Sequence, residues 1–270
     1  MTAEQFRFFA DLVKAASGIA LAPGKEYLVE SRLNELARGL GMKDMEELYR
    51  KARASLTPQF LEKIVDAMTT NETYFFRDQH PFEALKKSVL PELSKRNGNG
   101  RLRIWSAACS TGQEPYSLAM IIQEHFPTLA RGKCEILATD ISRQAVEKGT
   151  AGRFTQVEVN RGLPITFLIK YFTQNGAFWY AKDDLRKMVS FRIFNLLQPF
   201  SGLGTFDVIF CRYVLIYFDQ ETKNQILGRL ANTLNPGGWL FLGATETPTG
   251  LPSFMKRITL DKGSCWRREG

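Results

Sequence analysis

Apolar side chains in the first 70 residues recur every three or four positions, the spacing of one face of a helix. Two such series are Phe6, Phe9, Ala10 and Val13, and Val29, Leu33, Leu36 and Leu40. Asp44 opens a capping-box pattern before a third series, and Thr57-Pro58 supplies a cap and an N1 proline before a fourth. The pattern predicts four short helices that form a small all-helical N-terminal domain over residues 1–70.

The pattern changes at Asn71. Residues 71–77, NETYFFR, are rich in aromatic side chains without a clean period, which predicts a loop or linker. Apolar periodicity then predicts a helix around Pro81–Arg96, and the Asn-Gly-Asn-Gly run at 97–100 ends it. Residues 71–97 are therefore interpreted as a linker and a connecting helix.

From residue 98 to residue 270, strand-like and helix-like segments alternate. The predicted strands are 101–106, 135–139, 206–211 and 239–242, the predicted helices are 113–125, 142–149 and 219–234, and the predicted closing hairpin pairs 255–260 with 264–267. Alternation of this kind is typical of a doubly wound α/β sheet. One stretch, about 152–193, departs from it. There the strand-like runs Phe178–Ala181 and Met188–Phe194 flank a charged turn, which predicts an inserted antiparallel hairpin.

Composition excludes several classes of protein. Hydrophobic residues make up 44% of the 270 residues and charged residues 24%, as is ordinary for a globular protein. No apolar run approaches the ~20 residues of a membrane span, and the first residues lack the apolar segment of a secretory signal, so we expect a cytoplasmic protein without direct membrane insertion. The four cysteines have no close pair and only two histidines could join them, which argues against a Cys/His metal site.

The net charge of +8 is unevenly distributed. Residues 1–70 carry ten basic and ten acidic side chains, whereas residues 151–200 carry seven basic and three acidic ones. A basic face of this kind suits nucleic acid, an anionic lipid surface or an acidic protein partner, and it is equally compatible with an ordinary solvated surface.

Candidate chemistry lies where two predicted strands end. The segment 103–117 runs from a strand through small residues and Gly112 into a helix, and glycine lets a ligand approach the backbone closely. It contains neither GxGxxG nor GxxxxGK[ST] and is by itself a weak signal. Asp140 ends the next strand, where an acid is suited to accept both ribose hydroxyls of a nucleoside cofactor. The alternative, a helix cap, is better filled by Ser142.

These features, with the Asn-Pro-Gly-Gly turn at 235–238 and the closing hairpin, resemble an S-adenosylmethionine (SAM) dependent methyltransferase. Four motifs resemble the chemotaxis receptor methyltransferases, the CheR family, over essentially the whole chain. They are TNETYFFR (70–77), SAACSTGQEPYS (106–117), ATDI (138–141) and FCRYVLIYF (210–218). The implied fold is α/β: a small helical N-terminal domain and a Rossmann-like SAM-dependent methyltransferase domain with an inserted small antiparallel β-subdomain.

The resemblance implies methylation of glutamate side chains on membrane-bound chemoreceptors, giving glutamate methyl esters and S-adenosylhomocysteine (SAH) without a metal. The implied cofactor-binding residues, together with Gly112, are Asn71, Thr73, Arg77, Glu114, Asp140, Asn195, Leu196, Arg212 and Tyr213. Arg77 and Tyr217 are the implied catalytic residues, which align the reactants. The alternatives are a surface charge for Arg77 and core packing for Tyr217. A carboxylate with a pKa near ~4.3 is already a nucleophile, so no catalytic base is required.

The chain departs from the family pattern at three places. Tyr213 stands where the family commonly has asparagine, which predicts a cofactor contact through its backbone. Gly-Ala-Thr-Glu at 243–246 replaces the usual Gly-His-Ser-Glu, so the role of that loop is open. The hairpin around Asn175-Gly176 is short and lacks the glycine-rich turn of members that dock on a receptor-tail pentapeptide. We therefore expect a methyltransferase that does not need such a tether.

The expected partners are the cytoplasmic helices of chemoreceptors, with no nucleic acid partner. Arg32 and Arg38 lie on the polar side of the second predicted helix and are candidates to meet an acidic receptor helix, or they belong to a solvated face. The resemblance implies a monomer. Two alternatives stay open: a non-catalytic SAM- or SAH-binding signalling module, and a methyltransferase for RNA or a small molecule, which only the net charge favours.

Overall fold

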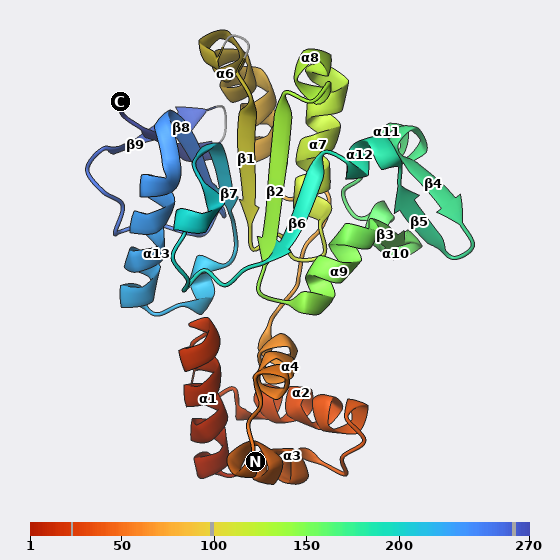
Figure 1. Ribbon diagram of the computed structural model, residues 1–270, viewed down its shortest axis with the longest axis vertical. Helices are drawn as coiled ribbons and strands as arrows, with labels where there is room; N and C mark the ends of the chain where they lie inside the picture. The colour runs from red at the N-terminus through yellow and green to blue at the C-terminus, as the bar shows by residue number, and fades with distance from the viewer. Residues whose placement is uncertain (23, 98–99, 261–262) are drawn as a thin grey trace. The chain divides into compact units, whose positions relative to one another are not determined.

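The computed structural model describes residues 1–22, 24–97, 100–260 and 263–270 (Figure 1). Its contacts divide the chain into two compact units. The first, called here the helical unit, contains Met1–Thr70 and Ile216–Thr222. The second, the sheet unit, contains Asn71–Leu215 and Lys223–Gly270. Each unit has a hydrophobic core of its own.

The helical unit contains the four predicted helices. They are α1 (Ala3–Ser17), α2 (Glu26–Gly39), α3 (Met45–Ala54) and α4 (Pro58–Met68). Asp44 and Thr57 cap α3 and α4, as their positions predict, by accepting backbone N–H groups of the first turn. The apolar face of each helix is buried in the core, with Phe9, Leu33 and Leu48 fully enclosed. The all-helical N-terminal domain is therefore confirmed.

The sheet unit is built on a seven-stranded sheet of order β6-β2-β1-β7-β8-β10-β9. Its strands are β1 (Leu102–Ala107), β2 (Cys134–Asp140), β6 (Val189–Ile193), β7 (Phe206–Cys211), β8 (Leu234–Leu242), β9 (Met255–Leu260) and β10 (Gly263–Arg268). The first five strands in this order are parallel, and β10 is antiparallel to both β8 and β9. The strand order reverses at β1, so ligand binding is expected at the carboxyl ends of β1 and its neighbours.

The remaining helices of the chain follow the predicted alternation. They are α5 (His80–Ala84), α6 (Leu90–Asn97), α7 (Gln113–His125), α8 (Pro127–Ala130), α9 (Arg143–Ala151), α10 (Gln156–Asn160), α11 (Ile165–Tyr171), α12 (Asp183–Arg186) and α13 (Gln220–Thr233). A π-helical turn, η1 (Leu85–Val89), joins α5 to α6, and short 3-10 turns cover η2 (Ser201–Leu203) and η3 (Leu215–Tyr217). Of the predicted helix break at 97–100, residues 98 and 99 lie outside the described residues.

The inserted subdomain differs from its predicted pairing. Its three-stranded antiparallel sheet has the order β3-β5-β4, with β3 (Arg153–Thr155), β4 (Phe172–Asn175) and β5 (Phe178–Ala181). The hairpin is β4–β5, so the expected pairing of 178–181 with 188–194 is wrong. Residues 189–193 instead form β6, which pairs in parallel with β2 at the edge of the main sheet. The charged segment between them is not a tight turn, because it forms α12 and buries Leu185.

The strand β8 also begins earlier than predicted. The Asn-Pro-Gly-Gly run at 235–238 lies within the strand instead of preceding it, and a register irregularity beside Phe206 and Val208 accommodates it. No helix in the described part of the chain combines the length and the hydropathy needed to cross a bilayer.

Candidate active site

Three loops of the sheet unit share an unusual backbone conformation. They are the segment 71–79, the loop after β1 and the loop after β7. The non-glycine residues with a positive φ in the described chain are Phe76, Asp78, Gln79, Ala108, Ser110 and Tyr213. All six belong to these loops. Such conformations are costly for residues with a Cβ and gather at functional sites. The carboxyl ends of β1 and β7 are therefore the candidate active site.

Asp140 lies at the end of β2 and is buried. Its Oδ2 accepts the N–H of Ser110 at 2.8 Å, and its Oδ1 accepts the N–H of Ser142 at 2.9 Å. Ser142 itself caps α9 by accepting the Ala145 N–H. Asp140 is thus not the helix cap. Two backbone donors therefore orient its carboxylate, which accepts hydrogen bonds through both oxygens.

The turn between β1 and α7 needs a glycine at 112. Gly112 has φ +98°, and a Cβ there would lie 3.1 Å from the Gly149 Cα and from the Phe191 ring. Glu114 follows in the first turn of α7 and is buried. Its Oε1 accepts the Ser106 hydroxyl at 2.7 Å, which fixes the carboxylate against the end of β1.

Arg212 connects the three loops. Its Nη1 donates to Glu114 Oε2 at 3.0 Å, and its Nη2 donates to Asp78 Oδ2 at 2.6 Å and to the Arg77 carbonyl at 2.8 Å. The Arg212 side chain is 2% exposed, so this is a buried ion-pair network. Loss of one partner from such a network leaves a charge without compensation, which is strongly destabilising.

Arg77 and Tyr213 lie against each other. The Arg77 guanidinium is 3.7 Å from the centre of the Tyr213 ring, and its Nη1 donates to the Glu72 carbonyl at 2.8 Å. The Tyr213 hydroxyl donates to Asp78 Oδ2, and its backbone N–H donates to Glu246 Oε2 at 2.8 Å. Burial, followed by the Asp78 contact, raises the pKa of the Tyr213 hydroxyl above its ordinary value. Arg77 is therefore part of the site and not an isolated surface charge.

The other expected cofactor residues line the same end of the sheet unit. Asn71 is exposed, and its carbonyl accepts the Ser110 hydroxyl at 2.9 Å. Thr73 is half-buried in the same segment. Asn195 and Leu196 follow β6, where the Phe194 N–H donates to the Asp140 carbonyl at 2.8 Å. The Asn195 Oδ1 accepts the Leu197 N–H at 2.9 Å, and Leu196 is buried.

Glu246 and Asp78 are site residues that the sequence did not single out as functional. The Glu246 carboxylate is buried and accepts three backbone N–H groups, from Tyr213, Gly243 and Leu215. Asp78 accepts from both Arg212 and Tyr213. The available signals were an acid at the end of the Gly-Ala-Thr-Glu loop and an acid directly after Arg77. Neither position reveals the partners of these two residues, because those partners are distant in the sequence.

Tyr217 belongs to the helical unit, so it is not among the residues that the sheet unit itself brings together. Its carbonyl accepts the Ala20 N–H at 2.8 Å. Two residues further on, Asp219 Oδ2 lies 2.9 Å from Lys14 Nζ. Contacts with α1 and the residues after it therefore hold the segment that contains Tyr217.

The two arginines expected to meet a receptor helix differ in their surroundings. Arg32 donates to the carbonyls of Met68 and Thr69 at 2.7 and 3.1 Å and to the Thr70 hydroxyl at 3.0 Å, so its guanidinium caps the end of α4. Arg38 is exposed, and its Nε donates to the Asn34 carbonyl of its own helix. Of the two, Arg38 has the guanidinium that is more available to a partner.

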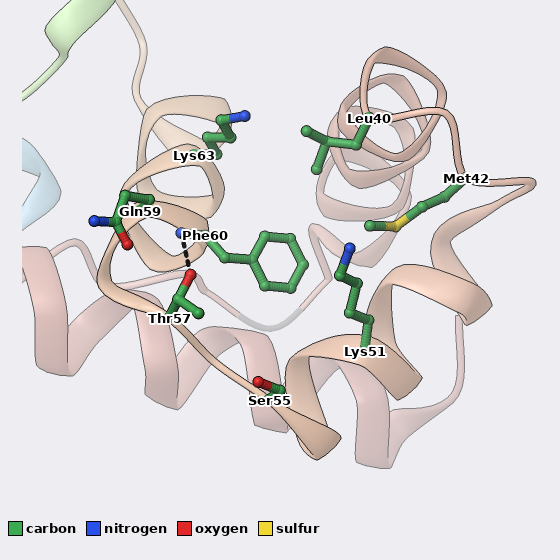
Figure 2. Close-up of a pocket in the computed structure, with 8 residues that line it drawn as sticks. All are labelled: Leu40, Met42, Lys51, Ser55, Thr57, Gln59, Phe60 and Lys63. Atoms are coloured by element: carbon green, nitrogen blue, oxygen red, sulfur yellow. Dashed lines mark hydrogen bonds between the residues drawn. The ribbon is translucent and has the colours of Figure 1, made fainter.

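A cavity of about 340 Å³ lies in the helical unit (Figure 2). It is lined by Leu40, Met42, Lys51, Ser55, Thr57, Gln59, Phe60 and Lys63. Figure 2 shows the Phe60 ring between the two lysine side chains. None of the expected site residues lines this cavity.

The thiols near the site are not nucleophiles at neutral pH. Burial, followed by the nearby carboxylates, raises the pKa of Cys109 and of Cys211 well above the ordinary thiol value. Within the described residues, no three His, Cys, Asp or Glu side chains stand close enough together to hold a metal ion.

The arrangement of these groups fits a nucleoside cofactor with an amino-acid tail. Asp140 presents an oriented carboxylate suited to two vicinal hydroxyls. Arg77 and Glu114 provide one cation and one anion, which suit a carboxylate and an ammonium group. The carboxylates of the site, Glu246 included, outnumber its two arginines, and this negative balance suits a cofactor with an extra positive charge.

Comparison with known proteins agrees with this description. The family model "CheR methyltransferase, SAM binding domain" matches residues 71–263, and "CheR methyltransferase, all-alpha domain" matches residues 4–69. The chain is 45% identical over 266 residues to chemotaxis protein methyltransferase 1 of Pseudomonas aeruginosa, which covers 97% of each chain. It is also 45% identical over 269 residues to chemotaxis protein methyltransferase Cher2 of Pseudomonas putida, covering 98% of this chain and 96% of that one.

Proposed function

From the premise that the chain belongs to the CheR methyltransferase family, we propose that it transfers the methyl group of SAM to glutamate side chains of chemoreceptors. The products are glutamate methyl esters and SAH. The observation that carries this proposal is the oriented Asp140 carboxylate at the end of β2, together with the Arg77–Tyr213 and Glu114–Arg212 pairs at the ends of β1 and β7. The near full-length similarity to two chemotaxis protein methyltransferases supports chemoreceptors as the acceptors.

In this proposal each side chain has one task. Asp140 binds the ribose hydroxyls, and Gly112 lets the cofactor approach the backbone of the turn. Glu114 binds the amino group of the methionine part and Arg77 its carboxylate. Asn71 and Thr73 border this part from the linker, Asn195 and Leu196 border the adenine, and the backbone after β7, with Arg212 and Tyr213, completes the site.

The bound cofactor supplies an electrophilic methyl group on a sulfonium ion. The glutamate carboxylate attacks without a general base, because it is already ionised at neutral pH. The chain therefore has to orient the reactants and exclude water, and positioning of this kind is worth up to ~7–11 kcal/mol. Tyr217 orients the acceptor carboxylate near the transferred methyl, and its segment is held by the contacts with Ala20 and Lys14.

The acceptor is proposed to dock without a tether. The β4–β5 hairpin turns through only residues 176–177, which is too short for a glycine-rich docking turn. A monomer acting on the cytoplasmic helices of chemoreceptors, with Arg38 on the exposed side of α2 as a contact, fits this arrangement. Micromolar binding of a receptor-tail pentapeptide would contradict it.

The experiment that tests the proposed function is transfer of radiolabelled methyl from SAM to membranes that contain chemoreceptors. Base-labile label identifies a carboxyl methyl ester, and Arg77→Ala should abolish it. Arg131→Ala, at an exposed arginine outside the site, is the matched control and should keep it. SAH binding without any transfer would instead favour a non-catalytic signalling module, and base-stable label would favour another acceptor.

A further inference from the structure

We propose that Tyr213 and Asp78 are positioning residues that hold the Arg77 guanidinium ready for the carboxylate of the cofactor. This inference rests on the proposed function, and it assigns side-chain roles to two residues that the resemblance leaves without one. Tyr213 acts as a flat support under Arg77, and Asp78 is kept away from Arg77 by its other two partners.

Tyr213 is fixed through both its backbone and its hydroxyl. Its backbone has φ +58°, a left-handed conformation that is unusual for an aromatic residue. The N–H is bound by Glu246 Oε2 at 2.8 Å, and the hydroxyl is bound by Asp78 Oδ2. The side chain is therefore held at both ends. Since a raised pKa keeps the hydroxyl protonated, it remains a donor throughout the neutral range.

The Tyr213 ring supports the Arg77 side chain. Its guanidinium lies over the Tyr213 ring, 3.7 Å from the ring centre, where the electron-rich face attracts a cation. Stacking leaves the N–H groups of the planar guanidinium directed outward along its edge, which is the geometry that pairs with a carboxylate. An asparagine at position 213 has neither a ring face nor the reach of a phenol, so it offers no equivalent support.

The acid nearest to Arg77 in the sequence pairs with other residues. Asp78 is the residue next to Arg77, yet its Oδ2 accepts from Arg212 Nη2 at 2.6 Å and from the Tyr213 hydroxyl. Arg77 donates instead to the Glu72 carbonyl, and among the residues that the structure describes no carboxylate lies within 4.0 Å of its guanidinium. Tyr213 and Arg212 together thus engage the neighbouring acid and leave the Arg77 charge for a ligand.

The test compares two ligands that differ in the amino-acid part. SAH contains the carboxylate that Arg77 is proposed to bind, whereas 5′-methylthioadenosine keeps the adenosine and the thioether but lacks that part. Calorimetry of Tyr213→Leu should show SAH binding weakened about 3- to 30-fold, the range from an exposed to a desolvated cation–π contact, with binding of 5′-methylthioadenosine unchanged. Tyr213→Phe keeps the ring and loses only the hydroxyl, so it should weaken SAH binding less and also spare 5′-methylthioadenosine.

Combining variants shows whether Tyr213 acts through Arg77. In an Arg77→Ala background, Tyr213→Leu should cause no further loss of SAH binding. The inference would be overturned if Tyr213→Leu or Tyr213→Phe lost affinity equally for SAH and 5′-methylthioadenosine. It would also be overturned if Tyr213→Leu weakened SAH binding as much in the Arg77→Ala background as in the wild type. Either result would leave Tyr213 a structural residue. Failure of the wild-type chain to bind SAH would instead contradict the proposed function itself.

Discussion

Glu246 and Tyr213 join the loops that follow two adjacent strands, since Glu246 Oε2 accepts the Tyr213 N–H at 2.8 Å. The same carboxylate accepts the N–H groups of Gly243 and Leu215 at 2.7 and 2.8 Å. One buried side chain therefore satisfies three backbone donors and holds Tyr213 in its left-handed conformation. The sequence alone indicated no role for the loop 243–246. The structure shows that this loop supports the loop that contains Arg212 and Tyr213.

Glu246→Ala is expected to lower both stability and SAH affinity. Three buried N–H groups lose their acceptor, and each unsatisfied group costs ~1–3 kcal/mol before the loop relaxes, so a total of about 3 kcal/mol is expected. Chemical unfolding and calorimetry with SAH measure the two effects. Glu147→Ala removes an exposed glutamate from α9 and should change neither quantity.

A second variant checks the same loop from the other side. A Cβ at Gly243 would lie 2.8 Å from Glu246 Oε2 and 3.0 Å from the Tyr213 nitrogen. Gly243→Ala should therefore displace the carboxylate and reproduce part of the Glu246→Ala effect on SAH binding. Wild-type affinity in both variants would show that the site does not depend on this support.

Asp140→Asn is expected to weaken SAM and SAH binding by about 10- to 100-fold, roughly the contribution of one hydrogen bond to a charged group. An amide can replace only one of the two oxygens that Ser110 and Ser142 orient, so its NH₂ group opposes a backbone donor. Calorimetric titration with SAH measures the loss. Ser142→Ala is the control, because it removes the cap of α9 at a cost of ~1 kcal/mol in stability but should leave SAH affinity near wild type. Equal loss of affinity in both variants would argue that Asp140 is structural.

Local sequence patterns predicted where helices and strands lie. They did not predict which strands pair over a long distance in the sequence. Gln113–His125 and Phe206–Cys211 begin and end where their periodicity and flanking residues predict. In contrast, the strand at 189–193 was paired with its neighbour in sequence, although its partner is β2, about 50 residues earlier. A strand's apolar pattern shows that it is buried and does not show which strand it pairs with.

The candidate site likewise combines residues that local patterns predict with contacts that they do not predict. Asp140 and Gly112 could be proposed from position alone, because a strand end and a tight turn are local features. The Arg212–Asp78 contact spans 134 residues, and the Tyr213–Glu246 contact spans 33. Their geometry depends on the order of strands in the sheet, so no short motif contains it.

The Lys14–Asp219 ion pair predicts a pH-dependent contribution to stability. The hydrogen bond from Lys14, followed by that from the Thr222 N–H, lowers the pKa of Asp219 well below its ordinary value, and the same pair raises the pKa of Lys14. A lowered carboxyl pKa stabilises the fold fully above its unfolded value of ~3.9 and progressively less as the pH falls below it. A raised lysine pKa stabilises the fold up to the unfolded value of ~10.4 and is lost as the pH rises through the folded value.

Thermal unfolding as a function of pH checks this expectation. Lys14→Gln should lower the melting temperature slightly near neutral pH, and the difference from wild type should shrink below about pH 4 and at high salt. Lys95→Gln, at an exposed lysine of α6, is the control. A difference that is constant with pH would show that the ion pair does not act through charge. The Lys14–Asp219 contact also holds the segment that contains Tyr217. Methyl transfer at neutral pH should therefore fall in Lys14→Gln, while SAH affinity is kept.

Gly162 and Gly176 form a matched pair that isolates one contact of the inserted subdomain. Both have a positive φ, +82° and +57°, so alanine costs each position a similar ~1 kcal/mol of backbone strain. A Cβ at Gly162 would also lie 2.1 Å from the Phe75 carbonyl oxygen, whereas nothing lies within 4 Å of one at Gly176. Chemical unfolding should therefore show a clearly larger loss for Gly162→Ala. Because Phe75 precedes Arg77 by two residues, only Gly162→Ala should also weaken SAH binding, and equal effects of the two substitutions would mean that the insert does not support the 71–77 segment.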